Sequence, residues 1–311
     1  MTEPASAVPA PPDRPVRVLV TGAGGYLGGA VVRALAAAGH RPVALIRSGG
    51  ADIPGAWDTR VADLRDSKDL RRAVAGVDAV CHLAGLTRAR ESFDEPLRYF
   101  EVNTGGTVAL LGAMAEEGVT GLVFSSTCAV YGSPDRQPMT EDLPVAPPHP
   151  YASSKVAAEA VVEAQALSGA LGAIVLRLPN LAGGEDRDPT RLIPRVLAAA
   201  RSQTPLGVNG DGSAVRDYLH VDDAAAAFVA AVHRLPAPGV FARYNLGSGR
   251  GTSILDVVAA VERVTGLRVP LTHNPPAAEP ATLVVDATKA AAELDWQPKL
   301  SEVDAIIASL G

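Results

Sequence analysis

The chain has 311 residues, of which 47% are hydrophobic and 20% charged, and its formal net charge at pH 7 is −6. This acidic balance offers no basic stripe for a phosphate backbone, so we expect no nucleic-acid partner. No uninterrupted apolar run of about 18 residues is present, and the two cysteines lie in apolar stretches as buried thiols do, so we expect a soluble cytoplasmic protein without membrane contact.

The predicted elements begin after a short tail. Residues 1–15 are rich in Pro and Ala, with no basic start before an apolar run, which predicts a disordered tail and no secretory signal. From Val16 onward, short β-branched runs alternate with Ala- and Leu-rich helical stretches. This alternation is typical of βαβ units, so we predict an α/β fold with a doubly wound parallel sheet, a Rossmann fold. The predicted strands are 16–21, 43–47, 78–82, 121–125 and 173–177, and the predicted helices are 26–38, 67–75, 95–117 and 151–168.

A glycine-rich turn lies between the first predicted strand and the first predicted helix. Glycines at such a turn bring backbone N–H groups and a helix N-terminus against a pyrophosphate. A glycine-rich loop alone is weak evidence, but this one has a strand before it and a helix after it. It therefore predicts a dinucleotide site, and the residues predicted to contact the cofactor there are Gly22, Gly25, Tyr26, Leu27 and Gly28.

The end of the second predicted strand bears on which dinucleotide binds. NAD sites usually place an acidic residue there, for the ribose 2′-hydroxyl. This chain has Arg47 and Ser48 instead, and a guanidinium matches the oxygens of a 2′-phosphate, although an exposed arginine without a ligand is the alternative. We predict NAD or NADP, with a mild preference for NADP. Asp63 and Leu64 follow the third strand, where Asp63 either meets the adenine edge or caps the next helix.

Tyr151 and Lys155 form a candidate proton-transfer pair. Their four-residue spacing puts both side chains on one face of a predicted helix. A phenol has an ordinary pKa near 10, and a nearby ammonium favours the phenolate, so such a tyrosine can exchange protons near neutral pH. In the sequence the pair comes after the predicted dinucleotide site. This order suits a tyrosine that exchanges protons while a cofactor oxidises an alcohol to a ketone.

The pattern changes after residue 180. Pro-, Gly- and charge-rich loops separate shorter predicted helices at 191–201, 222–234 and 254–264. We interpret residues 16–180 as a dinucleotide-binding Rossmann domain. Residues 181–311 are interpreted as a smaller α/β substrate-binding lobe, part of which crosses back to the first sheet.

Several motifs in this order make the chain resemble the extended short-chain dehydrogenase/reductase family. The resemblance is to its NAD-dependent epimerase/dehydratase branch, and most closely to nucleotide-sugar epimerases of the UDP-glucose 4-epimerase type. It extends from residue 16 to 298 and rests on the glycine turn, His82-Leu83-Ala84-Gly85, Asn103 with Gly106-Thr107, Phe124-Ser125-Ser126-Thr127, Val130-Tyr131-Gly132, Tyr151 to Lys155, and Arg216 to Val221. The resemblance implies further cofactor contacts at Leu83, Ala84, Gly85, Asn103, Ser125, Tyr151 and Lys155.

The resemblance also implies a catalytic group of Thr127, Tyr151 and Lys155. Thr127 would hold the substrate oxygen and Tyr151 would exchange its proton, while Lys155 lowers the tyrosine pKa and hydrogen-bonds the nicotinamide ribose. Hydride would leave a sugar carbinol and return to the other face of the ketone. Related dehydratases carry an Asp-Glu pair directly after the threonine, where this chain has Cys128-Ala129, so dehydration is not expected.

The substrate contacts implied by the resemblance lie in both halves of the chain. They are Ser126, Thr127, Asn180, Arg191, Leu192, Leu206, Val208 and Arg216, with Asn180 and Arg216 on a diphosphate and the aliphatic residues near the base. Two features depart from the family pattern. The segment 272–279 lacks the usual late arginine, and Arg191 replaces the usual asparagine before a Leu-x-Pro step. Either Arg191 restores the missing charge or the substrate differs from an ordinary UDP-hexose.

The sequence thus predicts an NAD(P)-dependent nucleotide-sugar 4-epimerase. An NADPH-dependent reductase of a 4-keto-sugar or another carbonyl compound is the alternative, and a non-catalytic dinucleotide sensor is a third. No metal-ligand spacing is present, so no metal is expected. The resemblance also implies a homodimer in which the 95–117 and 151–168 helices of two copies pack together.

Overall fold

The computed structural model describes residues 14–49, 52–276 and 280–310. Most of the predicted tail, residues 1–13, lies outside the described residues, as do residues 277–279 of the segment without the late arginine. A seven-stranded parallel sheet has the order β10-β6-β5-β4-β1-β2-β3. Its strands are β1 Arg17–Thr21, β2 Arg41–Ile46, β3 Asp58–Val61, β4 Ala79–His82, β5 Gly121–Thr127, β6 Gly172–Leu178 and β10 Phe241–Asn245. The order runs outward in both directions from β1 and β4, which confirms the predicted doubly wound α/β fold.

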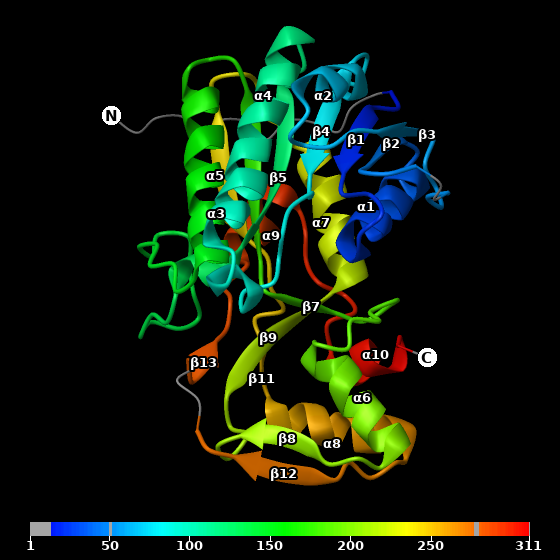
Figure 1. Cartoon of the computed structure of the whole chain (residues 1–311), viewed down its shortest axis with the longest axis vertical. Coiled ribbons are helices and arrows are strands. Elements are labelled where there is room, and N and C mark those ends of the chain that lie inside the picture. Colours follow the sequence, from blue (N-terminus) through cyan, green and yellow to red (C-terminus); the bar gives the residue numbers. More distant parts are fainter. Residues whose placement is uncertain (1–13, 50–51, 277–279, 311) are drawn as a thin grey trace.

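Helices cover both faces of this sheet, because its strands are apolar on both sides. Val18 and Val20 of β1 pack into one core, whereas Leu19 between them packs into the other, as the two-residue period of a strand requires. On the first face lie α1 (Tyr26–Ala37), α7 (Val221–His233) and α9 (Thr288–Leu294). On the second face lie α2 (Ser67–Val74), α4 (Gly106–Glu116) and α5 (Pro150–Leu167) (Figure 1).

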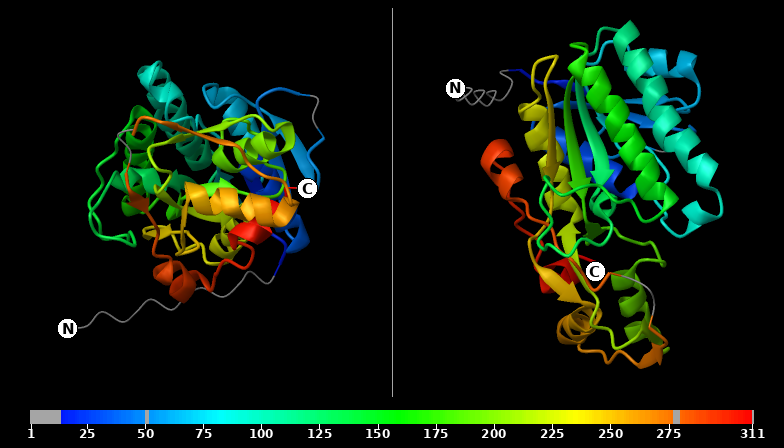
Figure 2. Two further views of the ribbon diagram at one scale, coloured as in Figure 1. Left: turned by 90° about the horizontal axis from the view of Figure 1, so that it is seen from below. Right: turned by 90° about the vertical axis from the view of Figure 1, so that its left-hand side faces the viewer.

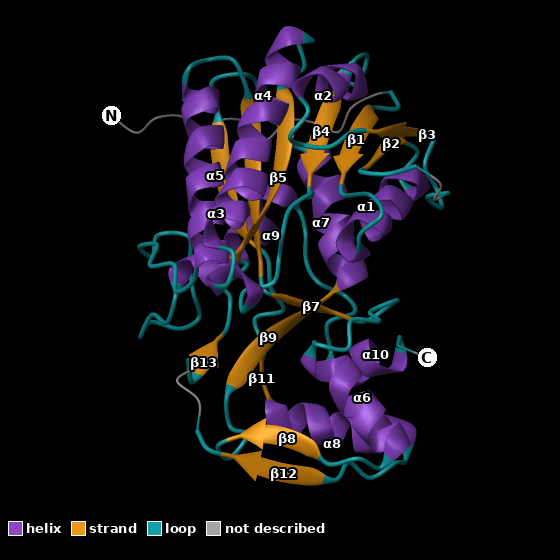
Figure 3. Ribbon diagram, viewed as in Figure 1, coloured by secondary structure: helices purple, strands orange, loops and turns teal. Residues whose placement is uncertain are grey.

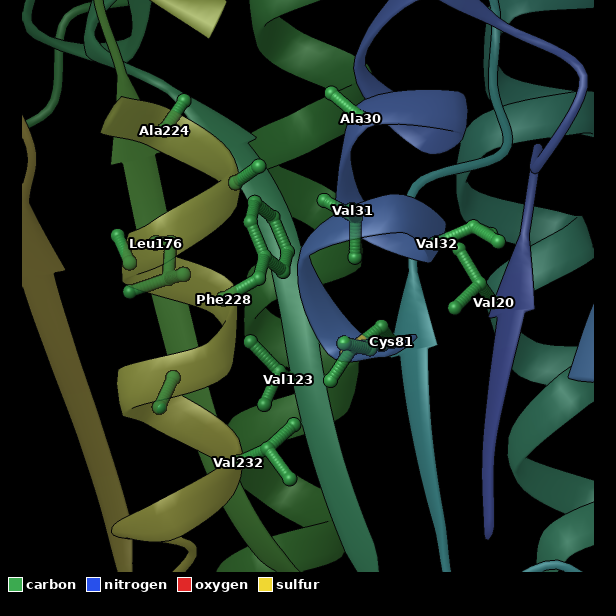
Figure 4. Packing of buried hydrophobic residues seen from close by; sticks show 14 of the residues in the cluster. Val20, Ala30, Val31, Val32, Cys81, Val123, Leu176, Ala224, Phe228 and Val232 are labelled. Carbon is green, nitrogen blue, oxygen red and sulfur yellow. The ribbon is translucent and has the colours of Figure 1, made fainter. Parts of the chain in front are cut away.

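The predicted 222–234 helix, which we had placed in the second lobe, packs on the first. It forms α7, and its Phe228 is fully buried against α1 and the sheet. Figure 4 shows the Phe228 ring projecting from α7 toward Val31, with Val123 and Cys81 of the sheet nearby. Truncating a buried phenylalanine typically lowers the free energy of unfolding by about 3–5 kcal/mol. The Phe228 contact therefore contributes strongly to the packing of α7 on the sheet. β10, an edge strand of the sheet, also joins the late chain to it.

The predicted helix at 95–117 is interrupted by a wide turn. It consists of α3 (Pro96–Tyr99), a π-helical segment (Phe100–Gly105) and α4. The side chain of Asn103, in the π-helical segment, is buried and exchanges two hydrogen bonds with the backbone of Leu86, at 2.7 and 3.0 Å. Such π segments are rare and often occur at functional sites. A sequence pattern with one helical period cannot reveal this extra residue in the turn.

A smaller lobe lies beyond the carboxyl ends of the sheet strands (Figures 1 and 2). Figure 3 shows that it mixes short strands with helices. Its elements are β7 Asn180–Ala182, α6 Leu192–Ser202, β8 Leu206–Asn209, β9 Val215–His220, β11 Gly251–Ser253, α8 Ile254–Thr265, β12 Leu271–Asn274, β13 Thr282–Leu283 and α10 Val303–Ala308. The helices α6, α8 and α10 share one apolar core with β8. The predicted smaller α/β lobe is therefore present, while the domain boundary at residue 180 stays a prediction.

Within the described ranges, no helix has the length and apolar character needed to cross a membrane.

A buried polar network joins the two central strands to the π-helical segment. The Thr21 hydroxyl accepts hydrogen bonds from the backbone of Leu83 and Ala84, both at 3.0 Å, so its own hydrogen is donated to His82 Nδ1 at 2.8 Å. His82 Nε2 then carries the ring hydrogen and donates to Thr107 at 3.1 Å, and Thr107 donates to the carbonyl of Asn103 at 2.6 Å. Every donor has an acceptor only if His82 is neutral.

We predict that protonation of His82 destabilises the fold. Burial and the nearby Lys155 lower its pKa from the ordinary 6.5 to about 3. A lowered folded-state pKa means that the stability is fully present above pH 6.5 and is lost as the pH falls toward 3. His82 should therefore reduce the unfolding free energy by up to about 1.4 kcal/mol per pH unit below pH 6.5.

Urea unfolding at several pH values between 7.5 and 5 measures this slope. His82→Gln should flatten it, whereas His273→Gln, at an exposed position, should leave it unchanged. An unaltered slope in His82→Gln would contradict the assignment.

Candidate active site

Three contacts set the position of Tyr151. Pro150 occupies the first turn of α5, where its fixed φ suits a helix start, and the His149 side chain caps the helix by accepting from Ala152 N at 3.1 Å. The His149 ring also stacks on Tyr151, with ring centroids 5.7 Å apart and planes at 14°. The Tyr99 ring meets Tyr151 edge-on, with centroids at 6.3 Å. The half-buried phenol is therefore oriented on two sides before any ligand binds.

Lys155 lies one turn further along α5 and is buried. Its Nζ donates to the carbonyl of Ser125 at 2.9 Å and lies 4.7 Å from the centre of the Phe124 ring. Burial lowers its pKa from 10.5 to about 8, against the opposing effect of the Glu159 carboxylate. Gly85 approaches so closely that a Cβ there would lie 2.8 Å from Asn103 Oδ1 and 3.7 Å from Lys155 Nζ. The structure thus brings Gly85, Asn103, Ser125 and Lys155 together.

Thr127 ends β5 beside the Tyr151 phenol. Its Oγ1 accepts from Ala129 N at 3.1 Å, which caps the 3₁₀ turn Cys128–Tyr131, so its hydroxyl hydrogen is directed elsewhere. The Thr127 side chain acts on the neighbouring phenol and lowers the pKa of Tyr151, which favours the phenolate. Thr127 and Tyr151 therefore lie together, and Lys155 is one helical turn further along α5, beside the Ser125 carbonyl.

The pKa of Tyr151 differs from the sequence-based expectation. We expected Lys155 to lower it, but burial raises it from 10.0 to about 12, with Thr127 acting in the opposite direction. The Lys155 ammonium is committed to the Ser125 carbonyl, and desolvation of the phenolate dominates. The ligand-free site therefore keeps Tyr151 protonated at neutral pH.

Ser126 faces away from Thr127, as alternation along β5 requires. Its hydroxyl donates to the buried Glu159 carboxylate, which also forms an ion pair with the buried Arg177 at 2.6 Å. Arg177 in turn donates to the Tyr131 hydroxyl at 2.8 Å. The predicted substrate contact of Ser126 stays a prediction, and in this structure the hydroxyl is bound within the interface between the sheet and α5.

The glycine turn fits a dinucleotide. A Cβ on Gly28 would lie 2.0 Å from the Gly22 carbonyl oxygen, so α1 packs directly on the turn only because Gly28 lacks one. Gly25 caps α1 without a side-chain hydrogen bond, which leaves N–H groups of the first turn, including those of Tyr26 and Leu27, for an anion. Thr21 holds the backbone of Leu83 and Ala84 beside this turn. These residues form the cradle that a pyrophosphate requires.

At the predicted adenine end, the negative charge of Asp63 is balanced by Arg65. Arg47 and Ser48 are exposed. The Asp63 carboxylate is bound by Arg65 at 2.8 and 3.0 Å, and its pKa is lowered to about 2 by Arg65, with Arg47 adding a smaller effect. The cap of α2 is Asp66, which accepts from two backbone N–H groups, so Asp63 does not cap that helix. Leu64 is buried in the core beside Gly106 and has only its backbone to offer an adenine.

The predicted substrate residues are more dispersed. Asn180 is exposed at the start of β7, and Leu192 is half-buried at the start of α6. The Arg216 guanidinium donates to the carbonyls of Val215 and Pro280 at 2.7 and 2.8 Å. The guanidinium of Arg191 lies 4.7 Å from the centre of the Tyr26 ring, on the side of the glycine turn.

The predicted base contacts of Val208 and Leu206 stay predictions, and only the backbone of these two residues is left to make them. Both side chains are buried in the core of the smaller lobe, at 2% and 4% exposure. Burial alternates along β8, so Gly207 and Asn209 lie on its other face. An aliphatic residue in a strand is as well suited to a core as to a ligand, and the sequence alone does not distinguish them.

Sequence reasoning left out two side chains that touch the site, His149 and Tyr99. The stacking of His149 on Tyr151 is not among the contacts that the sequence predicts. The signal was available, since a polar residue directly before Pro150 and a helical pattern is typical of an N-cap. No signal identified Tyr99, because its contact depends on how α3 packs against α5.

In the described part of the chain, no three His, Cys, Asp or Glu side chains are grouped as metal ligands would be.

Comparison with known proteins found consistent similarities. Residues 18–247 match the model of the NAD dependent epimerase/dehydratase family. The UDP-glucose 4-epimerase of Streptomyces lividans is 38% identical over 306 residues, covering 92% of this chain and 93% of that protein. The crystal structure of UDP-glucose 4-epimerase from Brucella ovis in complex with NAD is 35% identical, with a TM-score of 0.89, covering 94% and 97% of the two chains. The UDP-glucose-4-epimerase from Stenotrophomonas maltophila with bound NAD and formylated UDP-arabinopyranose is 32% identical, with a TM-score of 0.88, covering 95% and 96%.

We predict that the stacked ring of His149 maintains the high pKa of Tyr151. His149→Asn keeps a cap acceptor but removes the ring, so water should reach the phenol and its pKa should fall from about 12 toward 10. His149→Phe keeps a ring but removes the cap, so it should leave the tyrosine pKa high while lowering the unfolding free energy by about 1 kcal/mol.

Tyrosinate absorbance, titrated as a difference against the same variant carrying Tyr151→Phe, isolates this phenol. An unchanged Tyr151 pKa in His149→Asn would contradict a role for the ring.

Proposed function

Since this chain belongs to the NAD dependent epimerase/dehydratase family, we propose that it is a nucleotide-sugar 4-epimerase acting on UDP-linked hexoses. The observation that carries this proposal is that Thr127 lies close enough to Tyr151 for its side chain to lower the pKa of the phenol, with Lys155 one helical turn further along α5. This group adjoins the turn after β4, which Thr21 holds beside the glycine cradle. A hydroxyl positioner, a proton acceptor and a dinucleotide cradle together suit reversible oxidation of an alcohol.

The proton steps follow from the chain's own residues. Bound NAD would supply a hydride acceptor and a positive charge that lowers the pKa of Tyr151 from its ligand-free value of about 12. Thr127 holds the sugar hydroxyl oxygen while the Tyr151 phenolate takes its proton. When the ketone oxygen regains its hydrogen, Tyr151 returns that same proton, so no external acid is consumed. Lys155, with a pKa of about 8, is mostly protonated at neutral pH and keeps spare N–H donors for the ribose.

NAD is the proposed cofactor rather than NADP. The mild preference for NADP that we drew from Arg47 finds no support in the solved relatives, since the Brucella ovis and Stenotrophomonas maltophila structures are described with NAD. The electrostatics agree, because the Asp63 carboxylate acts on Arg47 and would oppose a 2′-phosphate.

Arg191 is proposed to contact a diphosphate oxygen in place of the family's late arginine. Its Nη1 is buried and, among the described residues, has no hydrogen-bond partner, although it lies 3.3 Å from Asp186 Oδ1. A buried donor without a partner is costly, and a phosphate oxygen would relieve that cost. Asn180 and Arg216 are retained as proposed contacts on the same diphosphate.

A homodimer is proposed on the helical face that carries α3, α4 and α5. Leu97, Val108 and Leu167 on these elements are exposed by 83%, 51% and 69%. Phe93, in the 3₁₀ turn Glu91–Phe93 before α3, is 63% exposed. Large apolar side chains gathered on one face are typical of a surface that a second copy covers.

Interconversion of UDP-glucose and UDP-galactose by the purified protein is the expected activity. Tyr151→Phe should lower kcat by about 10²- to 10⁴-fold, because it removes the proton acceptor. Tyr244→Phe is the matched control, since its hydroxyl bonds to Glu293 on α9, and it should retain wild-type kcat within about twofold. Absence of interconversion for any UDP-hexose, together with substrate-dependent consumption of NADPH, would replace the epimerase by the reductase.

Leu97→Glu and Val108→Glu should each weaken the dimer. A charge at a buried apolar interface costs several kcal/mol, so light scattering at micromolar concentration should shift from dimer toward monomer. Leu300→Glu, which alters a 44% exposed side chain away from these helices, should leave the mass unchanged. A wild-type protein that is monomeric under these conditions would rule out the dimer.

A further inference from the structure

The loop of residues 183–191, between β7 and α6, is attached at its first residues to two distant elements. The Tyr26 hydroxyl, in the first turn of α1, donates to the Gly183 carbonyl at 2.6 Å. The next amide, Gly184 N, donates to the Ser309 hydroxyl beyond α10 at 2.8 Å, and His220 donates to that same hydroxyl at 3.0 Å. The start of the loop is therefore held by both lobes.

The end of the loop returns to the same tyrosine. The Arg191 guanidinium lies 4.7 Å from the centre of the Tyr26 ring, a cation–π contact. Asp186, whose side chain is only 2% exposed, lies 3.3 Å from Arg191 Nη1. Gly183 and Arg191 thus converge on Tyr26, the residue that follows the glycine turn. The two ends of the loop are therefore held close together at Tyr26, and residues 184–190 lie between them.

The middle of the loop is joined to the chain that follows β4. One oxygen of Asp188 accepts from Thr190 N and Oγ1 at 2.9 and 2.7 Å, which fixes the carboxylate. The other oxygen lies 3.6 Å from Arg88 Nη2. Arg88 follows Gly85 by three residues, and its carbonyl accepts from the Tyr99 hydroxyl at 2.8 Å. The backbone of Arg88 is therefore held, while its side chain is 56% exposed.

These attachments place the loop across the dinucleotide site. β1 and β4 are neighbours in the sheet, at the point from which the strand order runs outward in both directions. Dinucleotides bind outside the carboxyl ends of the strands at such a point. Tyr26 lies just after β1 and Arg88 just after β4, so a loop that contacts both bridges the two sides. In Figure 1 the segment between β7 and α6 runs below the lower end of α1.

We propose that the 183–191 loop is a strap over the bound dinucleotide, and that the Arg88–Asp188 ion pair is its releasable fastening and slows cofactor release. This inference rests on the proposed function. The base of the loop is held by hydrogen bonds and by a partly buried cation–π contact, whereas the Arg88–Asp188 pair is half-exposed. An exposed ion pair contributes little and is screened by salt, which suits a fastening that opens in each binding cycle. An epimerase has to keep its dinucleotide between two hydride transfers, and such a fastening serves that need.

The test compares cofactor release in full-length Arg88→Gln, Asp188→Asn, the double variant and the wild type, each loaded with NAD and diluted into competing nucleotide. Each single variant should release NAD about two- to fivefold faster. The double variant should release it no faster than Asp188→Asn, because Asp188 also lies 3.9 Å from Arg191 Nε and its replacement removes both contacts. Raising the salt from about 0.05 to about 0.5 M should accelerate release from the wild type and leave Arg88→Gln nearly unchanged.

Arg90→Gln is the matched control, since Arg90 is exposed in the same segment and its loss changes the net charge equally. It should release NAD at the wild-type rate. Release from Arg88→Gln and Asp188→Asn at the wild-type rate would overturn the strap, as would equal acceleration by Arg90→Gln. A wild-type protein that binds no dinucleotide would instead refute the proposed function, so the two failures are distinguishable.

Discussion

The burial of the Lys155 ammonium is the constraint on which the candidate site depends. A buried cation is costly unless it is paired and hydrogen-bonded, and here it meets the Ser125 carbonyl, the Phe124 ring and the field of Glu159. Glu159 is itself buried and requires Arg177, which joins β6 to α5. The buried cation thus lies beside a second group of buried charges, in which Glu159 binds Arg177 and also accepts from the Ser126 hydroxyl of β5.

The cost of burying a charge also sets the pKa of Tyr151. The Tyr151 phenol is oriented by His149 and Tyr99, yet burial raises its pKa to about 12. The protein therefore fixes the orientation of the Tyr151 phenol, whereas its ionisation would depend on a charge that the ligand brings. Under the proposed function, the positive charge of a bound nicotinamide would favour the phenolate, which would couple proton transfer to cofactor binding. The 183–191 loop contacts Tyr26, which follows the glycine turn, and Arg88, which follows β4, so it connects the two sides of the proposed cofactor site.

Local patterns predicted the elements that depend on local physics. The glycine turn, the alternation of strands and helices before residue 180, and the start of α5 at Pro150 were all recognisable, because backbone conformation and apolar periodicity act over a few residues. The features that the sequence did not predict share another cause. Val208, Ser126 and the π-helical segment around Asn103 depend on what packs against them, and strand alternation alone does not say which face meets a ligand.

The sequence by itself determined the fold class, the family and the spacing that puts Tyr151 and Lys155 on one helix face. These follow from short-range geometry and from ordered motifs. Only the tertiary structure decided that Tyr151 stays protonated without a ligand, that Ser126 serves Glu159, and that the 183–191 loop reaches Arg88 across the cofactor cradle. The physical reason is that pKa values, hydrogen-bond partners and burial depend on residues brought together by packing, which can lie far apart in the chain, as Tyr26 and Gly183 do at 157 positions.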